Sequence, residues 1–173
     1  MIILINGTTH TGKTCLAQKM LENYKYPYLS IDHLKMGLIR SGYTDLTVED
    51  DEKLTPYLWK IVKEIVKTAI ENNQNLIIEG GYIPFDWRSY FEDEYIAKIR
   101  YICLAMSDEY IEKNFDKIVA HSNNIEKRID DKQLTIRHLK EENNKYILGC
   151  QKYGENIVVI KDNYKKTIAT LLL

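Results

Sequence analysis

The chain has 173 residues, 45% hydrophobic and 28% charged, with a formal net charge of −1, which is typical of one globular domain and gives no general attraction to nucleic acid or to an anionic membrane. No apolar run approaches the roughly 18 residues needed to cross a bilayer, and no cationic start followed by an apolar segment indicates a signal peptide. The three cysteines are widely spaced and odd in number, which argues against a disulfide framework, so we expect a single domain over residues 1–173 in the cytoplasm.

The chain begins with a short apolar run that leads into a glycine-containing loop. Ile2–Asn6 is almost entirely apolar, which predicts a strand buried on both faces. Residues 7–14 read Gly-Thr-Thr-His-Thr-Gly-Lys-Thr, and a predicted helix runs from Lys13 to about Asn23. All four fixed positions of the pattern G-x-x-x-x-G-K-[ST] are matched in the strand–loop–helix context that the motif requires. We therefore predict a phosphate-binding loop for a nucleoside triphosphate.

The residue types of this loop each suit phosphate binding. Glycine at positions 7 and 12 permits a tight backbone whose amides approach phosphate oxygens, helped by the positive end of the following helix. Lys13 is expected to reach the β- and γ-phosphates, and the Thr14 hydroxyl to bind Mg²⁺. The residues expected to contact the nucleotide are Gly7, Thr8, Thr9, His10, Thr11, Gly12, Lys13, Thr14 and Cys15. The sequence leaves open whether His10 contacts the γ-phosphate or is an exposed spacer.

An acidic residue follows the second predicted strand. Tyr26–Ile31 is that strand, Asp32 comes directly after it, and His33–Arg40 is predicted to be helical. Asp32 is suited to accept a proton from an acceptor hydroxyl, and also to be the N-cap of the helix. Arg40 can bind an anionic acceptor or be a solvated cation favoured by the helix dipole. Both pairs of alternatives remain open.

A second acidic residue ends the third predicted strand. A long amphipathic helix is expected to open at Thr47, with Asp50 as a capping partner, and to end near Asn72. The run Asn75–Glu79 then closes on an acid, which is the Walker-B arrangement. Glu79 is expected to hold Mg²⁺ through water or to orient the acceptor, and Arg88 further along is expected to contact acceptor charge.

The remaining elements complete an alternation of strands and helices. Strands are expected at Ile99–Met106 and Asn156–Ile160, and helices at Asp108–Ala120, at Leu134–Tyr153 and at the C-terminus. Such alternation predicts a parallel sheet of five strands with right-handed crossovers and helices on both faces. Ligands of such sheets bind beyond the carboxyl ends of the strands.

A basic segment lies where a lid would cover the phosphates, over roughly residues 121–137. Arg128 and Arg137 are expected to place positive charge on the transferred phosphoryl group, because a mobile element must exclude water during transfer and admit it afterwards. The alternative is a helix surface covered by ordinary salt bridges.

Three stretches resemble small bacterial P-loop kinases of the adenylate kinase-like, zeta-toxin-like and 2-phosphoglycerate kinase-like group. They are Ile5–Thr14, Tyr28–Arg40 and Ile77–Pro84. The resemblance implies a three-layer α/β/α P-loop NTPase fold with a five-stranded parallel sheet and a small helical lid. Asp32 matches the aspartate base of chloramphenicol phosphotransferases and zeta toxins. Adenylate kinases have an arginine that resembles Arg40, and a lid matched by Arg128-Ile129-Asp130-Asp131 with Arg137.

The sequence as a whole thus favours a kinase that transfers the γ-phosphoryl group of ATP, with Mg²⁺, to a hydroxyl of a small acceptor. Arg40 and Arg88 would allow this acceptor to carry a negative charge. Two alternatives remain open. One is a nucleoside monophosphate kinase, although no arginine directly follows the proline after the third strand as it does in adenylate kinases. The other is an ATP-dependent switch or binding protein with slow hydrolysis. No membrane or nucleic-acid partner is expected.

Overall fold

A computed structural model describes residues 1–121 and 134–172. The elements are β1 (Ile2–Gly7), α1 (Lys13–Tyr24), β2 (Tyr28–Ser30), α2 (Ile31–Arg40), α3 (Asp51–Glu71), β3 (Leu76–Glu79), η1 (Trp87–Tyr90), α4 (Asp93–Ile96), β4 (Ile99–Met106), α5 (Asp108–His121), α6 (Ile136–Tyr153), β5 (Ile157–Ile160) and α7 (Tyr164–Ala169). None of the helices in these two ranges is both long and apolar enough to span a bilayer.

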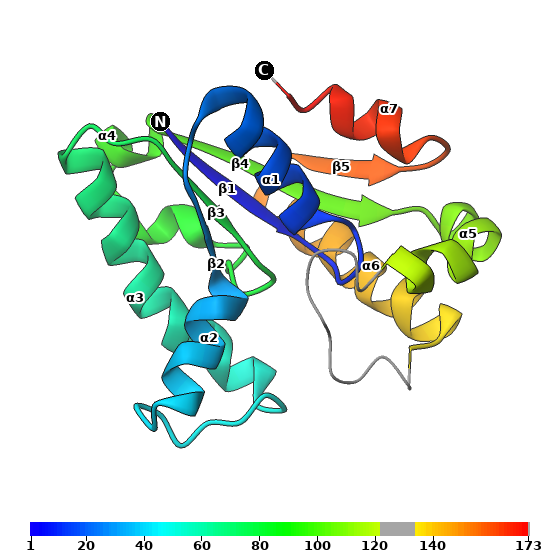
Figure 1. The fold of residues 1–173 in the computed structure, drawn as a ribbon, viewed down its shortest axis with the longest axis horizontal. Coiled ribbons are helices and arrows are strands. Elements are labelled where there is room, and N and C mark those ends of the chain that lie inside the picture. The colour runs from blue at the N-terminus through cyan, green and yellow to red at the C-terminus, as the bar shows by residue number, and fades with distance from the viewer. Residues whose placement is uncertain (122–133, 173) are drawn as a thin grey trace.

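The five strands form one parallel sheet in the order β2-β3-β1-β4-β5 (Figure 1). The register places Glu79 at the end of β3 opposite Ser30 at the end of β2, and opposite Ile5 of β1 on its other side. The end of β1 pairs with β4, where Gly7 lies opposite Leu104. The carboxyl ends of β1, β2 and β3 therefore meet at one edge, as expected for a ligand site in such a sheet.

The central strand β1 supplies both faces of the core. Its even residues, Ile2 and Leu4, pack in the cluster that includes α3, and its odd residues, Ile3 and Ile5, pack against α1 and α7. All four are fully buried, which confirms the predicted two-sided strand. Burial of each such side chain contributes about 2 kcal/mol. The helices thus lie on both sides of the sheet, in three layers.

Three predicted helix starts differ from the structure, and one of them is that of α6, which begins at Ile136 rather than at Leu134, with Thr135 as its N-cap. Helix α2 begins at Ile31 with Ser30 as its N-cap, so Asp32 lies within the first turn and is not the cap. An acid is favourable there as well, because the first turn carries the positive end of the helix dipole. Helix α3 begins at Asp51 rather than at Thr47; the Thr47 amide and hydroxyl do donate to the Asp50 carboxylate, at 2.9 and 3.0 Å, but before the helix starts.

Gly7 is the position in the loop where a side chain is least tolerable. Its φ is +142°, and a Cβ would lie 2.3 Å from the Leu104 carbonyl oxygen in the neighbouring strand, which cannot move without breaking the sheet. We expect Gly7→Ala to destabilise the fold by about 2 kcal/mol. This corresponds to a melting temperature lower by about 4–8 °C in thermal unfolding.

The matched control is Gly37→Ala. Gly37 lies in α2, and a Cβ built there meets no atom within 4 Å. Alanine favours a helix over glycine by about 0.5–1 kcal/mol, so this variant should melt at the same temperature or slightly higher. Equal melting temperatures for the two variants would contradict the role given to Gly7.

Candidate functional site

The loop between β1 and α1 is curled around the carbonyl of Thr8. The Thr11 hydroxyl and the Lys13 ammonium both donate to the Thr8 carbonyl oxygen, each at 2.7 Å. Thr8 and Thr11 are fully buried, and Lys13 is 8% exposed. Gly12 has φ +81°, and a Cβ there would lie 1.9 Å from the hydroxyl oxygen of Tyr164 at the start of α7. The loop is thus closely packed, and its lysine lies at its centre.

Thr14 and Glu79 are brought together from distant parts of the chain. The Thr14 hydroxyl donates to a Glu79 carboxylate oxygen at 3.3 Å, and Glu79 is 1% exposed. A hydroxyl and a carboxylate beside the predicted phosphate-binding loop are the hard oxygen ligands that Mg²⁺ takes, directly or through water. The two residues predicted to hold Mg²⁺ therefore fit that ion in chemistry and in position.

Replacing Glu79 tests this pair. We expect Glu79→Gln to raise the Mg²⁺ concentration needed for half-maximal ATP turnover by about 10- to 100-fold, because the amide removes the negative charge near the ion. A Mg²⁺ titration at saturating ATP measures the shift. Glu64→Gln, on the exposed side of α3, is the matched control and should leave the titration unchanged. An unaltered Mg²⁺ requirement in Glu79→Gln would remove Glu79 from the metal site.

Helix α6 holds the loop through two residues that the sequence did not single out. The Asn143 side-chain oxygen accepts from the Thr8 hydroxyl at 3.0 Å and from the Met106 amide at 2.6 Å. A Glu142 oxygen accepts from the Thr9 amide at 3.0 Å. Asn143 is fully buried and lies one turn after the buried Leu139. The sequence does carry a signal for Asn143: an asparagine lies at a position on the buried face of the predicted helix. Such a side chain needs hydrogen-bond partners inside the protein.

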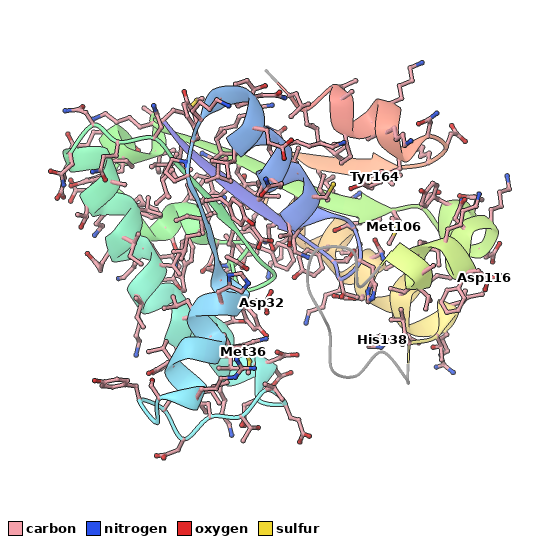
Figure 2. All side chains as sticks on the ribbon, viewed as in Figure 1. Asp32, Met36, Met106, Asp116, His138 and Tyr164 are labelled. Carbon is pink, nitrogen blue, oxygen red and sulfur yellow. The ribbon has the colours of Figure 1, made fainter. Side chains whose placement is uncertain are left out.

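Asp32, labelled in Figure 2 at the start of α2, belongs to a series of polar contacts beside the ends of β2 and β3. Its carboxylate lies 2.8 Å from the Lys35 ammonium, one helical turn away on α2. Lys35 also donates to the Tyr82 hydroxyl at 2.8 Å, and that hydroxyl donates to Asp51 at 2.7 Å. Burial, and then the hydrogen bond to Asp51, raise the pKa of Tyr82 above its ordinary value, so the hydroxyl stays protonated.

Two aromatic side chains, those of Tyr146 and Phe85, lie next to this series of polar contacts. The Tyr146 hydroxyl of α6 donates to the Gly81 carbonyl at 3.0 Å, and its ring meets Phe85 edge to face, with centroids 5.3 Å apart. Burial is the main reason that the pKa of Tyr146 is raised, followed by the negative charge of Glu142. The loop after β3 and helix α6 are thereby fixed to each other next to Asp32. The sequence predictions did not include Lys35, Tyr82 or Tyr146, although the spacing of Asp32 and Lys35 is that of a helical ion pair.

The two arginines expected to bind the acceptor lie in η1 and at the end of α2. Arg88, in η1, pairs with Glu155: its Nε lies 2.6 Å from one carboxylate oxygen and a terminal nitrogen lies 3.2 Å from the other. Its guanidinium also lies over the Trp87 ring, 4.5 Å from the centroid. Arg40 is exposed at the end of α2, about 12 Å along the helix axis from Asp32.

The other predicted site residues are the two lid arginines and two residues of the predicted nucleotide site, His10 and Cys15. Arg137 is 88% exposed in the first turn of α6 and pairs with Glu141 at 2.7 Å. Arg128, with its neighbours in the basic segment, lies outside the described residues. His10 adopts the left-handed backbone, with φ 62°. Cys15 is a half-buried free thiol at the start of α1.

No protein-family model matches this chain, and no curated protein sequence matches it. Several solved structures do. A deoxyadenosine kinase from M. mycoides has 17% identity and a TM-score of 0.58, over 99% of this chain and 96% of that chain. A shikimate kinase from Aquifex aeolicus has 17% identity and a TM-score of 0.51, over 99% and 94%. A gluconokinase from Sinorhizobium meliloti has 12% identity and a TM-score of 0.51, over 98% and 88%.

The chain has the fold of P-loop kinases. This agrees with the five parallel strands, their flanking helices and the loop after β1, and it confirms the predicted α/β fold class. At 12 to 17% identity the likeness concerns the fold. The three named neighbours act on different small molecules, so the nature of the acceptor has to be argued from the residues of this chain.

Proposed function

We propose that this protein is a kinase that transfers the γ-phosphoryl group of ATP, in the presence of Mg²⁺, to a hydroxyl group of a small acceptor. The observation that carries the proposal is the arrangement at one edge of the sheet. The loop lysine, the Thr14–Glu79 pair and Asp32 come from three different strand ends that the register places next to one another.

Each residue has a distinct task in this reaction. The loop amides and Lys13 hold the β- and γ-phosphates, while Thr14 and Glu79 hold Mg²⁺, which supplies positive charge to the phosphates when it is bound. The acceptor oxygen attacks the γ-phosphorus, the bond from that phosphorus to the bridging oxygen breaks, and ADP leaves. Asp32 takes the proton of the attacking hydroxyl. Lys35, 2.8 Å away, keeps the Asp32 carboxylate in place.

The lid residues act on the transferred group. Arg128 and Arg137 are proposed to neutralise the charge that spreads over the phosphoryl oxygens. His10, at the turn of the loop, and Cys15 are proposed to lie beside the nucleotide through their backbone amides. Within the P-loop kinases we place the chain in the adenylate kinase-like, zeta-toxin-like and 2-phosphoglycerate kinase-like group, acting in the cytoplasm on small molecules.

A screen of metabolites tests the proposal. ATP and Mg²⁺ are incubated with the protein and with one compound at a time, and ADP formation is compared with an ATP-only reaction. We expect at least one hydroxyl compound to raise ADP formation, with a phosphorylated product visible by mass spectrometry. Tight ATP binding with no acceptor in a broad set would favour the switch protein instead. ADP formation only with AMP would favour the nucleoside monophosphate kinase.

A further inference from the structure

The surroundings of Asp32 are rich in carboxylates. Asp32 and Asp51 lie at the two ends of the chain of contacts through Lys35 and Tyr82. Glu142 adds a third carboxylate one turn before Tyr146 on α6, and the Tyr146 hydroxyl donates to Gly81, the residue next to Tyr82. Burial, and then the negative charge of Glu142, raise the pKa of Tyr146. The Lys35 ammonium lies between the Asp32 carboxylate and the Tyr82 hydroxyl.

The cations that an anionic acceptor would need are already paired or distant. Lys35 is 13% exposed and has both Asp32 and the Tyr82 hydroxyl as partners. Arg88 is held by both oxygens of Glu155. Arg40 is exposed, and it lies about 12 Å along α2 from Asp32. A carboxylate or phosphate placed beside Asp32 would face the like charge of Asp32, and the three cations just named are already paired or distant.

Two polar groups on the neighbouring elements, one on α6 and one at the end of β2, are buried without a hydrogen-bond partner in the described part of the chain. One oxygen of Glu142 accepts from the Thr9 amide, and its other oxygen is buried with no hydrogen-bond partner among the described residues. The Ser30 hydroxyl, at the end of β2, is also buried without a partner there. A buried carboxylate oxygen left without a donor is costly, so a ligand that brings O–H or N–H groups would be bound preferentially.

We infer that the phosphoryl acceptor is a polyhydroxyl compound without negative charge, of the sugar or nucleoside type, with amine substitution tolerated. This inference rests on the proposed kinase function. Asp32 takes the proton of the reacting hydroxyl, and Glu142 accepts a hydrogen bond from a second hydroxyl or amine. The Tyr146–Phe85 pair lies along an apolar face of the acceptor, as aromatic rings do against sugar and base rings.

Charge separation of a metabolite mixture tests the inference. A small-molecule extract of bacterial cells is divided by anion exchange into a retained, anionic fraction and an unretained fraction, and each is incubated with the protein, ATP and Mg²⁺. We expect ADP formation above the ATP-only control at least 10-fold greater in the unretained fraction. Activity found mainly in the retained fraction would overturn the inference and leave the kinase function in place. Activity in neither fraction, with ATP still bound, would overturn both.

A variant of Glu142 gives a second readout on the isolated acceptor. We expect Glu142→Gln to raise the KM for the acceptor about 10-fold, because a charged hydrogen bond is replaced by a neutral one. The Kd for ATP should change less than this KM, because the glutamine oxygen can still accept from the Thr9 amide of the loop. Glu64→Gln on α3 is the control and should change neither constant. A larger change in ATP affinity than in acceptor KM would assign Glu142 to the loop alone and overturn its acceptor role.

Discussion

Lys13→Ala is expected to lower ATP-dependent turnover by about 10³-fold, the effect of removing one preorganised group that stabilises charge in a transition state. Lys13 is 8% exposed and lies within the loop, where its ammonium donates to the Thr8 carbonyl. Alanine leaves the backbone amides but removes the positive charge that the phosphates require. The measurement is steady-state ADP formation, together with ATP affinity by calorimetry.

Two comparisons separate the loss of charge from damage to the loop. Lys19→Ala, on the same helix α1, should retain full turnover, which controls for a lysine lost nearby. The melting temperature of Lys13→Ala should stay close to that of the parent protein, since the contacts of Thr11 with Thr8 remain. If Lys13→Ala binds and turns over ATP as well as the parent protein, the loop is not a triphosphate site and the proposed function is wrong.

Asp32→Asn is expected to lower phosphoryl transfer by about 10²- to 10⁴-fold and to leave the Kd for ATP unchanged. The amide keeps the size of the side chain but cannot take a proton from the acceptor hydroxyl. Because Asp32 lies on α2, outside the loop, nucleotide binding should not depend on it. Single-turnover measurements with saturating acceptor report the transfer step directly.

Lys35→Met distinguishes catalysis from structure at this position. It removes the ion pair at 2.8 Å but leaves the Asp32 carboxylate, so its loss of rate should be at least 10-fold smaller than that of Asp32→Asn if Asp32 is the base. Equal losses in the two variants would mean that Asp32 acts only as the partner of Lys35. An exposed aspartate on α5, replaced as Asp116→Asn, is the control and should retain the parental rate.

The features that the sequence predicted are those determined by short stretches. The loop motif occupies eight consecutive positions, and a run such as Leu76–Glu79 predicts both a buried strand and the acid at its end. The predicted sheet was therefore confirmed, and the register brings Glu79 beside Thr14. The roles of the individual residues stay predictions until they are tested.

The features that the sequence could not predict depend on contacts between distant residues. Asn143 meets Thr8 across 135 positions, and no local pattern specifies that pairing. The predicted start of α2 was wrong by two residues, because an aspartate is favourable both as a cap and in the first helical turn. Arg88 illustrates the same limit: its pairing with Glu155 joins residues 67 positions apart, and no local pattern specifies it.

Helix α6 contacts both halves of the reaction. Through Asn143 and Glu142 it holds the loop proposed for ATP, and one turn later, through Tyr146, it holds the Gly81 carbonyl on the acceptor side. Any displacement of this helix by one ligand would reach the binding site of the other. The two affinities would then be thermodynamically linked, and by reciprocity the factor by which ATP alters the affinity for acceptor must equal the factor by which acceptor alters the affinity for ATP.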